Sequence, residues 1–264
     1  MTPPKPETRI IQRGRNHSYL LDGDKVPGVT TILNKGFPKA ALVGWAAKAA
    51  AQEVIDCWEQ LLELTPSQRF EQVRTAPDRD RDKAAHRGTE VHDYAHRYLA
   101  GEEITPPDEL AGHVDAYVKF VDEWAPQELA TEAAVFSRRY RYGGRFDLLA
   151  RLADGNLWLL DLKTSRSGVF LEAVLQLAAY RYADFYVLPG EVDEHGVAVE
   201  HPMPTVDRAG VVWLRADRSY ELYPVDADDQ AFAIFGLVQG VAGFASSSFG
   251  DWIGDPLRPL EEAA

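Results

Sequence analysis

The chain has 264 residues, of which 45% are hydrophobic and 26% are charged, and its formal net charge at pH 7 is −13. This length and composition predict a large globular unit with a substantial core and argue against global disorder. The acidic balance argues against a protein that coats nucleic acid, because such binding is mainly electrostatic. Any contact with DNA is therefore expected to be local.

A single cysteine, Cys57, leaves no disulfide framework and no set of thiolates for a zinc or iron–sulfur site. No apolar run approaches the about 18 residues that a membrane span needs, and the N-terminus has no apolar signal core. We therefore expect a soluble protein of the cytoplasm that makes no contact with a membrane.

The first third of the chain predicts a hairpin followed by helices. Residues 17–33 indicate a short hairpin leading into a helix, and the alanine- and leucine-rich residues 40–64 indicate a longer helix. Polar residues 65–82 predict a connection with one short helix. Residues 83–99 have helical spacing, with Gly88 marking a restart that Thr89 caps.

The remaining two thirds predict an α/β domain. A further helix is expected after two prolines, with Asp108 as its cap, and the period then changes to that of strands. The expected elements are three antiparallel strands (130–141, 144–152 and 156–164), a helix within 169–188, a hairpin within 210–225 and a closing helix (226–245). This order predicts a mixed central sheet flanked by helices.

The expected organisation has three parts. Residues 1–82 form an N-terminal hairpin and helical region packed on the core, residues 83–250 form the core, and residues 251–264 form a tail.

The turn "ADGN" at residues 153–156 sets the register of the middle hairpin. A type I turn with a bulge pairs Leu152 with the asparagine of this turn, and counting back places Asp147 opposite Asp161. Opposite residues of antiparallel strands point to the same face, which Lys163 shares. Two carboxylates and an ammonium group are therefore expected to converge.

Opposed carboxylates are costly unless a charge compensates them. A hard cation such as Mg²⁺ or Mn²⁺ would do so, with Lys163 orienting or deprotonating a water. The alternative is a plain salt-bridge network of Lys163 with Asp147 and Asp161.

Two helices add polar groups to this hypothesis. Gln176 and Tyr180 are four residues apart and share one helical face, from which both can reach the site. His92 and His96 are likewise on one face of the earlier helix, and an imidazole suits Mn²⁺ somewhat better than Mg²⁺.

Four motifs in order, "GTEVH", "GGRFDLL", "LLDLKTS" and "QLAAY", resemble the RecB-like branch of the PD-(D/E)xK nuclease superfamily over about residues 84 to 185. The resemblance implies a restriction-endonuclease-like core and hydrolysis of phosphodiester bonds with Mg²⁺ or Mn²⁺. Members linked to helicases or CRISPR systems often carry an iron–sulfur cluster on four cysteines. This chain resembles the cluster-free members, including phage recombination exonucleases.

The resemblance also implies roles for individual residues. Implied metal ligands are His92, Asp147, Asp161 and the backbone carbonyl of Leu162. Implied catalytic residues are Asp147, Asp161, Lys163, Gln176 and Tyr180. Glu132 and Glu90 are weaker candidates for carboxylates behind the ligands. Substrate contacts are expected from Arg138, Arg139, Arg145, Thr164 and Arg166.

The expected function is a metal-dependent DNA exonuclease of phage or bacterial recombination and repair. Its expected partners are linear DNA with a free end and a recombinase or single-strand annealing protein. The residues leave open a structure-specific endonuclease, and also a catalytically silent DNA-binding module of the same fold. The polarity and strandedness of the DNA and the oligomeric state are open as well.

Overall fold

The computed structural model describes residues 7–13 and 16–254. Its helices are α1 (Val29–Gly36), α2 (Ala40–Asp56), α3 (Trp58–Glu63), α4 (Pro66–Arg74), α5 (Ala76–Leu99), α6 (Asp108–Trp124), α7 (Glu172–Arg181) and α8 (Asp229–Phe244). Its strands are β1 (Arg9–Arg13), β2 (Asn16–Leu21), β3 (Asp24–Val26), β4 (Gln127–Thr131), β5 (Ala134–Ser137), β6 (Tyr142–Arg145), β7 (Leu148–Arg151), β8 (Leu157–Lys163), β9 (Phe185–Val187), β10 (His201–Pro202), β11 (Arg208–Leu214) and β12 (Tyr220–Val225).

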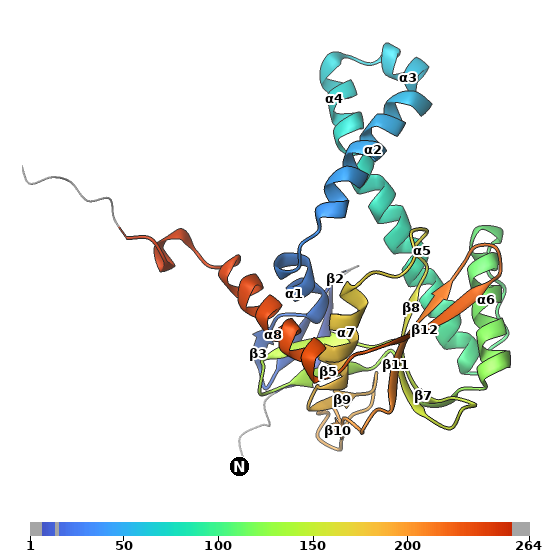
Figure 1. Ribbon diagram of the computed structural model, residues 1–264, viewed down its shortest axis with the longest axis vertical. Helices are drawn as coiled ribbons and strands as arrows, with labels where there is room; N and C mark the ends of the chain where they lie inside the picture. The colour runs from blue at the N-terminus through green and yellow to red at the C-terminus, as the bar shows by residue number, and fades with distance from the viewer. Residues whose placement is uncertain (1–6, 14–15, 255–264) are drawn as a thin grey trace, which may run out of the picture.

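A five-stranded mixed sheet of order β12-β11-β8-β7-β4 forms the centre of the molecule. Strand β8 pairs in parallel with β11 and antiparallel with β7, while the outer pairs β11–β12 and β4–β7 are antiparallel. Helices α5 and α6 lie on one side of this sheet, and α7 lies on the other (Figure 1). The prediction of an α/β fold with a mixed sheet between helices is confirmed.

Strand β8 is buried because both faces of the sheet are covered, which explains its continuous apolar run. Leu157 and Leu159 pack into the cluster around α7, whereas Trp158, Leu160 and Leu162 pack into the cluster around α5 and α6. Since side chains alternate along a strand, residues 161 and 163 continue the row that faces α7.

The predicted register of the β7–β8 hairpin is confirmed. The amide of Leu152 donates to the carbonyl of Asn156 at 3.1 Å, and Gly155 has the positive φ of 79° that the bulge requires. The ladder runs back to the pair of Leu148 with Leu160. Asp147 and Asp161 are the next residues on the two chains.

The first two predicted strands are wrong as continuous strands. Residues 130–141 divide into β4 and β5, and residues 144–152 divide into β6 and β7, so that β5 and β6 belong to a second sheet of order β10-β9-β5-β6. The two chains bend together, because the amide of Glu132 donates to the carbonyl of Asp147 and that of Phe146 to the carbonyl of Ala133. We call this paired bend the kink.

Helices α2 to α5 form an arm that projects from the sheets, with α3 and α4 at its tip (Figure 1). The prediction of a mainly irregular connection over 65–82 is wrong, because Thr65 forms a capping box that starts α4 and α5 begins at Ala76. Helix α5 continues through Gly88, and the Thr89 hydroxyl bonds the carbonyl of Ala85 instead of capping. The expected boundary between residues 82 and 83 therefore falls inside α5.

Two other local expectations also differ from the structure. Asp108 is the first residue of α6 rather than its cap, and makes no capping hydrogen bond. The helix expected within 169–188 ends at Arg181, and residues 185–187 form β9 at the edge of β5. The closing hairpin and the helix that follows it form as expected.

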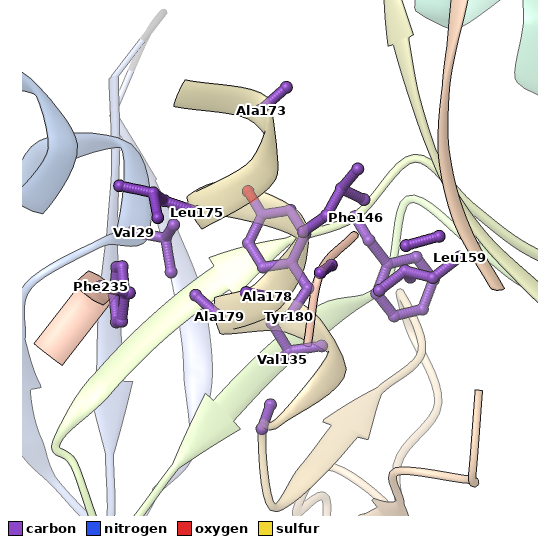
Figure 2. Packing of buried hydrophobic residues seen from close by; sticks show 14 of the residues in the cluster. Val29, Val135, Phe146, Leu159, Ala173, Leu175, Ala178, Ala179, Tyr180 and Phe235 are labelled. Carbon is purple, nitrogen blue, oxygen red and sulfur yellow. The ribbon is translucent and has the colours of Figure 1, made fainter. Parts of the chain in front are cut away.

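Helix α7 packs against the sheet, α1 and α8, and most of its side chains are buried. Figure 2 shows Tyr180 projecting from α7 among the side chains of Val29, Val135 and Phe146. The Tyr180 ring lies against Gly144, where any Cβ atom would overlap it. This packing fixes α7 over the end of β8.

Candidate active site

The candidate site lies where four segments meet: the kink, the end of β8, the middle of α5 and the first turns of α7. The kink presents Glu132 and Asp147, and β8 presents Asp161 and Lys163. Glu132 has a φ of 51°, an uncommon left-handed conformation for a residue with a side chain, as often found at functional sites. The bend and the strand end together direct the carboxylates to one place.

His92, Glu132 and Asp147 form a compact group whose potential ligand atoms all lie within 4.8 Å of one another. The His92 Nδ1 atom is 3.3 Å from Asp147 Oδ1 and 3.7 Å from Glu132 Oε1. Its Nε2 atom is 3.1 Å from the carbonyl oxygen of Leu162, to which it donates. That hydrogen bond fixes the ring and turns Nδ1 towards the two carboxylates.

Asp161 belongs to an adjacent set of polar groups. One of its oxygens, Oδ1, accepts hydrogen bonds from Lys163 Nζ at 3.0 Å and from Gln176 Nε2 at 2.9 Å. Gln176 also donates to the Tyr180 hydroxyl at 3.1 Å. The other oxygen, Oδ2, is 2.7 Å from Lys163 Nζ as an ion pair, but it is buried and has no well-aligned hydrogen bond within the described residues.

The two sets are joined through the backbone of β8. Asp147 Oδ2 accepts a hydrogen bond of 2.6 Å from the amide of Leu162, the residue between Asp161 and Lys163. The carbonyl of Leu162 is the acceptor for His92. The expected convergence of Asp147, Asp161 and Lys163 is thus present in the structure.

The charges of these groups shift one another's pKa values. Burial lowers the pKa of His92, but the charge of Asp147 and hydrogen bonds to Asp147 and Glu132 outweigh burial and raise the pKa from 6.5 to about 10. Burial raises the pKa of Asp147, yet the charge and hydrogen bond of His92 leave it below its ordinary value. In the protein without a cation, His92 is therefore the positive charge that balances Asp147.

Asp161 and Lys163 behave differently. Burial raises the pKa of Asp161, and the attraction of Lys163 offsets this only in part, since Asp147 adds repulsion. Burial lowers the pKa of Lys163, but the charges of Asp161 and Asp147 outweigh it, so the pKa is raised. Lys163 is accordingly an ammonium group at neutral pH, and it acts as a donor rather than as a base.

The donor set fits a divalent cation. Two carboxylates and one imidazole nitrogen within 4.8 Å suit Mn²⁺ and, with water in the remaining positions, Mg²⁺. The orphaned oxygen of Asp161 is a further acceptor close to this group. Relative to the expected ligands, His92 and Asp147 are in the compact group, Glu132 joins them, and Asp161 and the Leu162 carbonyl are engaged by Lys163 and His92.

Sequence reasoning treated Glu132 only as a residue behind the ligands. Its place in the group depends on the bend of the chain, for which the local pattern gives no signal beyond the end of an alternating run. Glu90, the other weaker candidate, is half-exposed and lies 3.7 Å from His86 on its own helix. His96 has a buried Nδ1 atom without a hydrogen bond among the described residues and is outside the group.

Two of the expected substrate-binding arginines lie in the turn after β5. Arg138 forms ion pairs of 2.8 Å with Asp22 and 2.7 Å with Glu200, which tie the β2–β3 turn to the second sheet. Arg139 lies over the ring of Tyr140 at 5.2 Å. Arg138 is therefore committed to the fold, while Arg139 is exposed.

The other three lie closer to the site. Arg145 is 3.1 Å from Glu132 through its Nε atom, so it contacts the compact group directly. Arg166 follows the end of β8, is largely exposed and lies 3.4 Å from Asp80 of α5. Thr164 is buried where α5 passes β8 closely.

The comparisons with known proteins place no name on this arrangement. No family model matches the chain, and no curated protein matches it. Among solved structures, the crystal structure of SSO0001 is similar at 12% identity with a TM-score of 0.31, and the likeness covers 63% of this chain and 72% of that one. The function therefore has to be inferred from the residues of the site.

Within the described residues, the structure contains no helix that is long and apolar enough to cross a membrane.

Proposed function

We propose that this protein is a metal-dependent deoxyribonuclease, and that it is an exonuclease. The observation that carries the proposal is the convergence of Asp147, Asp161 and Lys163 on the end of β8, next to the group of His92, Glu132 and Asp147. Buried acidic groups with one lysine are what phosphodiester hydrolysis requires, since the reaction develops negative charge on the phosphate.

A divalent cation, Mg²⁺ or Mn²⁺, would be held by His92, Glu132 and Asp147, and would supply charge neutralisation and a lowered pKa for water. Lys163 is charged and 35% exposed, so its ammonium group can donate to the attacking water or to a phosphate oxygen. Gln176 and Tyr180 hold Asp161, which in turn holds Lys163.

The DNA has to approach an acidic protein, which favours a local cationic path. Arg145 and Arg166 lie on opposite sides of the site and are partly or largely exposed. Contacts of this kind predict binding that weakens steeply as salt concentration rises. An isolated salt-bridge network would give no such dependence.

The resemblance to cluster-free phage recombination exonucleases supports the remaining parts of the proposal. We place the activity in DNA recombination or repair, in the cytoplasm of a bacterial cell or of the host cell of a phage. The proposed partners are DNA with a free end and a recombinase or single-strand annealing protein.

The deciding experiment incubates linear and covalently closed circular DNA with the purified protein in Mg²⁺, Mn²⁺ or EDTA. Wild type should release nucleotides from linear DNA only, and only with a cation. Lys163→Ala and Asp161→Ala should lose this activity, whereas Lys119→Ala, which changes an exposed lysine of α6, should keep it. Equal digestion by Lys163→Ala would refute the nuclease, and cleavage of closed circles would replace an exonuclease with an endonuclease.

A further inference from the structure

A cavity opens beside Lys163 and Gln176, between α1 and the loop that joins β8 to α7. Its volume is about 210 Å³. The lining residues are Thr30, Leu33, Asn34, Lys39, Lys163, Ser165, Gly168, Phe170, Glu172, Ala173 and Gln176. Since Lys163 and Gln176 both bind Asp161, the cavity and the candidate active site share a wall.

We propose that this cavity binds the nucleobase of the nucleotide adjoining the bond that is cut, an inference that rests on the nuclease function proposed above. The cavity is smaller than the about 300 Å³ at which pockets for drug-sized ligands begin, so it suits a single planar ring system. One nucleotide separates a base from its phosphate, which matches a cavity that begins where Lys163 ends.

Phe170 provides the face on which a base stacks. Its side chain is 51% exposed although it is a large aromatic residue, and it is outside the buried clusters that form the core. Aromatic rings that line a groove next to a phosphate path are the usual platforms for bases of single-stranded nucleic acid. The neighbouring Leu171 is 76% exposed but does not line this cavity.

Asn34 provides a donor for the polar edge of a base. Lys39 Nζ donates to Asn34 Oδ1 at 2.6 Å, which fixes the amide with its oxygen towards the lysine. Its amide nitrogen is therefore directed elsewhere, and no acceptor for it is found among residues 7–13 and 16–254. A carbonyl oxygen or ring nitrogen of a base is such an acceptor.

The charges of the lining favour a base over a phosphate at this place. Lys39 Nζ is 2.8 Å from Glu172 Oε1, so these two charges neutralise each other. Lys163 is likewise paired with Asp161. The interior then offers apolar walls from Leu33, Phe170 and Ala173 and an amide donor, which is the complement of an uncharged heteroaromatic ring.

The test measures binding of short single-stranded oligonucleotides to the full chain in EDTA, where no hydrolysis is expected. The oligonucleotides are either intact or abasic at the first or the last nucleotide. Wild type should bind the intact strand about tenfold more tightly than the strand that is abasic at one of its two ends, within the range for base–aromatic stacking. Phe170→Ala should bind the intact strand about tenfold more weakly and no longer distinguish the two strands.

Leu171→Ala is the matched control, because it removes an exposed apolar side chain of the same loop outside the cavity. It should retain the preference of wild type, and Asn34→Asp, which removes the amide donor, should reduce it. The cavity proposal is overturned if wild type ignores the missing base at both ends, or if Phe170→Ala keeps the full difference.

Hydrolysis of unmodified DNA in Mg²⁺ separates this inference from the function on which it rests. Hydrolysis without any dependence of binding on the terminal base overturns the cavity and leaves the nuclease intact. Base-dependent binding without hydrolysis under any cation overturns the nuclease and supports the cavity as a nucleobase site. Failure of wild type both to bind and to hydrolyse DNA overturns both.

Discussion

Binding of a divalent cation should displace a proton from His92, and this gives a measurement that does not depend on catalysis. The ring faces Asp147 at 3.3 Å and Glu132 at 3.7 Å through Nδ1, the atom that a cation would take. With a pKa of about 10, His92 is protonated in essentially all molecules at pH 7. An ordinary pKa of 6.5 would leave only about a quarter protonated.

The expected release at pH 7 is therefore about one proton per bound cation, against about a quarter of a proton for an unperturbed histidine. Apparent affinity should rise about tenfold for each pH unit between pH 7 and 9, because the cation competes with that proton. Isothermal titration calorimetry with Mn²⁺ in buffers of different ionisation enthalpy measures the proton count directly.

His92→Asn should bind more weakly and release almost no proton, while His86→Asn, on the same helix, should behave as wild type. Release of a quarter of a proton or less by wild type would refute the account of the His92 environment. The same shift has a consequence for the protein without a cation. Its raised pKa gives stability that is fully present below pH 6.5 and lost as the pH rises through about 10, so urea midpoints should fall over that interval.

Three further predictions concern the fold around the site. Gly144→Ala should destabilise the protein by about 1–3 kcal/mol in urea denaturation, because the new Cβ would overlap the Tyr180 ring. Arg138→Lys should cost about 1 kcal/mol by the same assay while leaving the salt dependence of DNA binding unchanged, since its two-atom contact with Asp22 is structural; a reduced salt slope would show that it contacts phosphate instead. Thr65→Ala should increase hydrogen exchange in α4 alone, by about 1 kcal/mol of local opening free energy, through loss of the capping box.

Several elements were not predictable from local patterns. The restart expected at Gly88 does not occur, because α5 passes close to Thr164 there and the missing side chain serves that approach within an unbroken helix. Arg138 belongs to a basic run that resembles a phosphate-binding surface, yet its partners come from residues about 60 and 116 positions away. In both cases a contact between distant segments overrides the local signal.

The sequence by itself determined the central pair of carboxylates and the lysine. A turn of known geometry and the two-residue period of strands are local properties, so they place Asp147, Asp161 and Lys163 on one face without any knowledge of the rest of the chain. Only the tertiary structure decided that Glu132 and His92 meet them. The left-handed residue in the kink turns Glu132 inward, and the contact of α5 with β8 joins His92 to Leu162 across 70 positions of sequence.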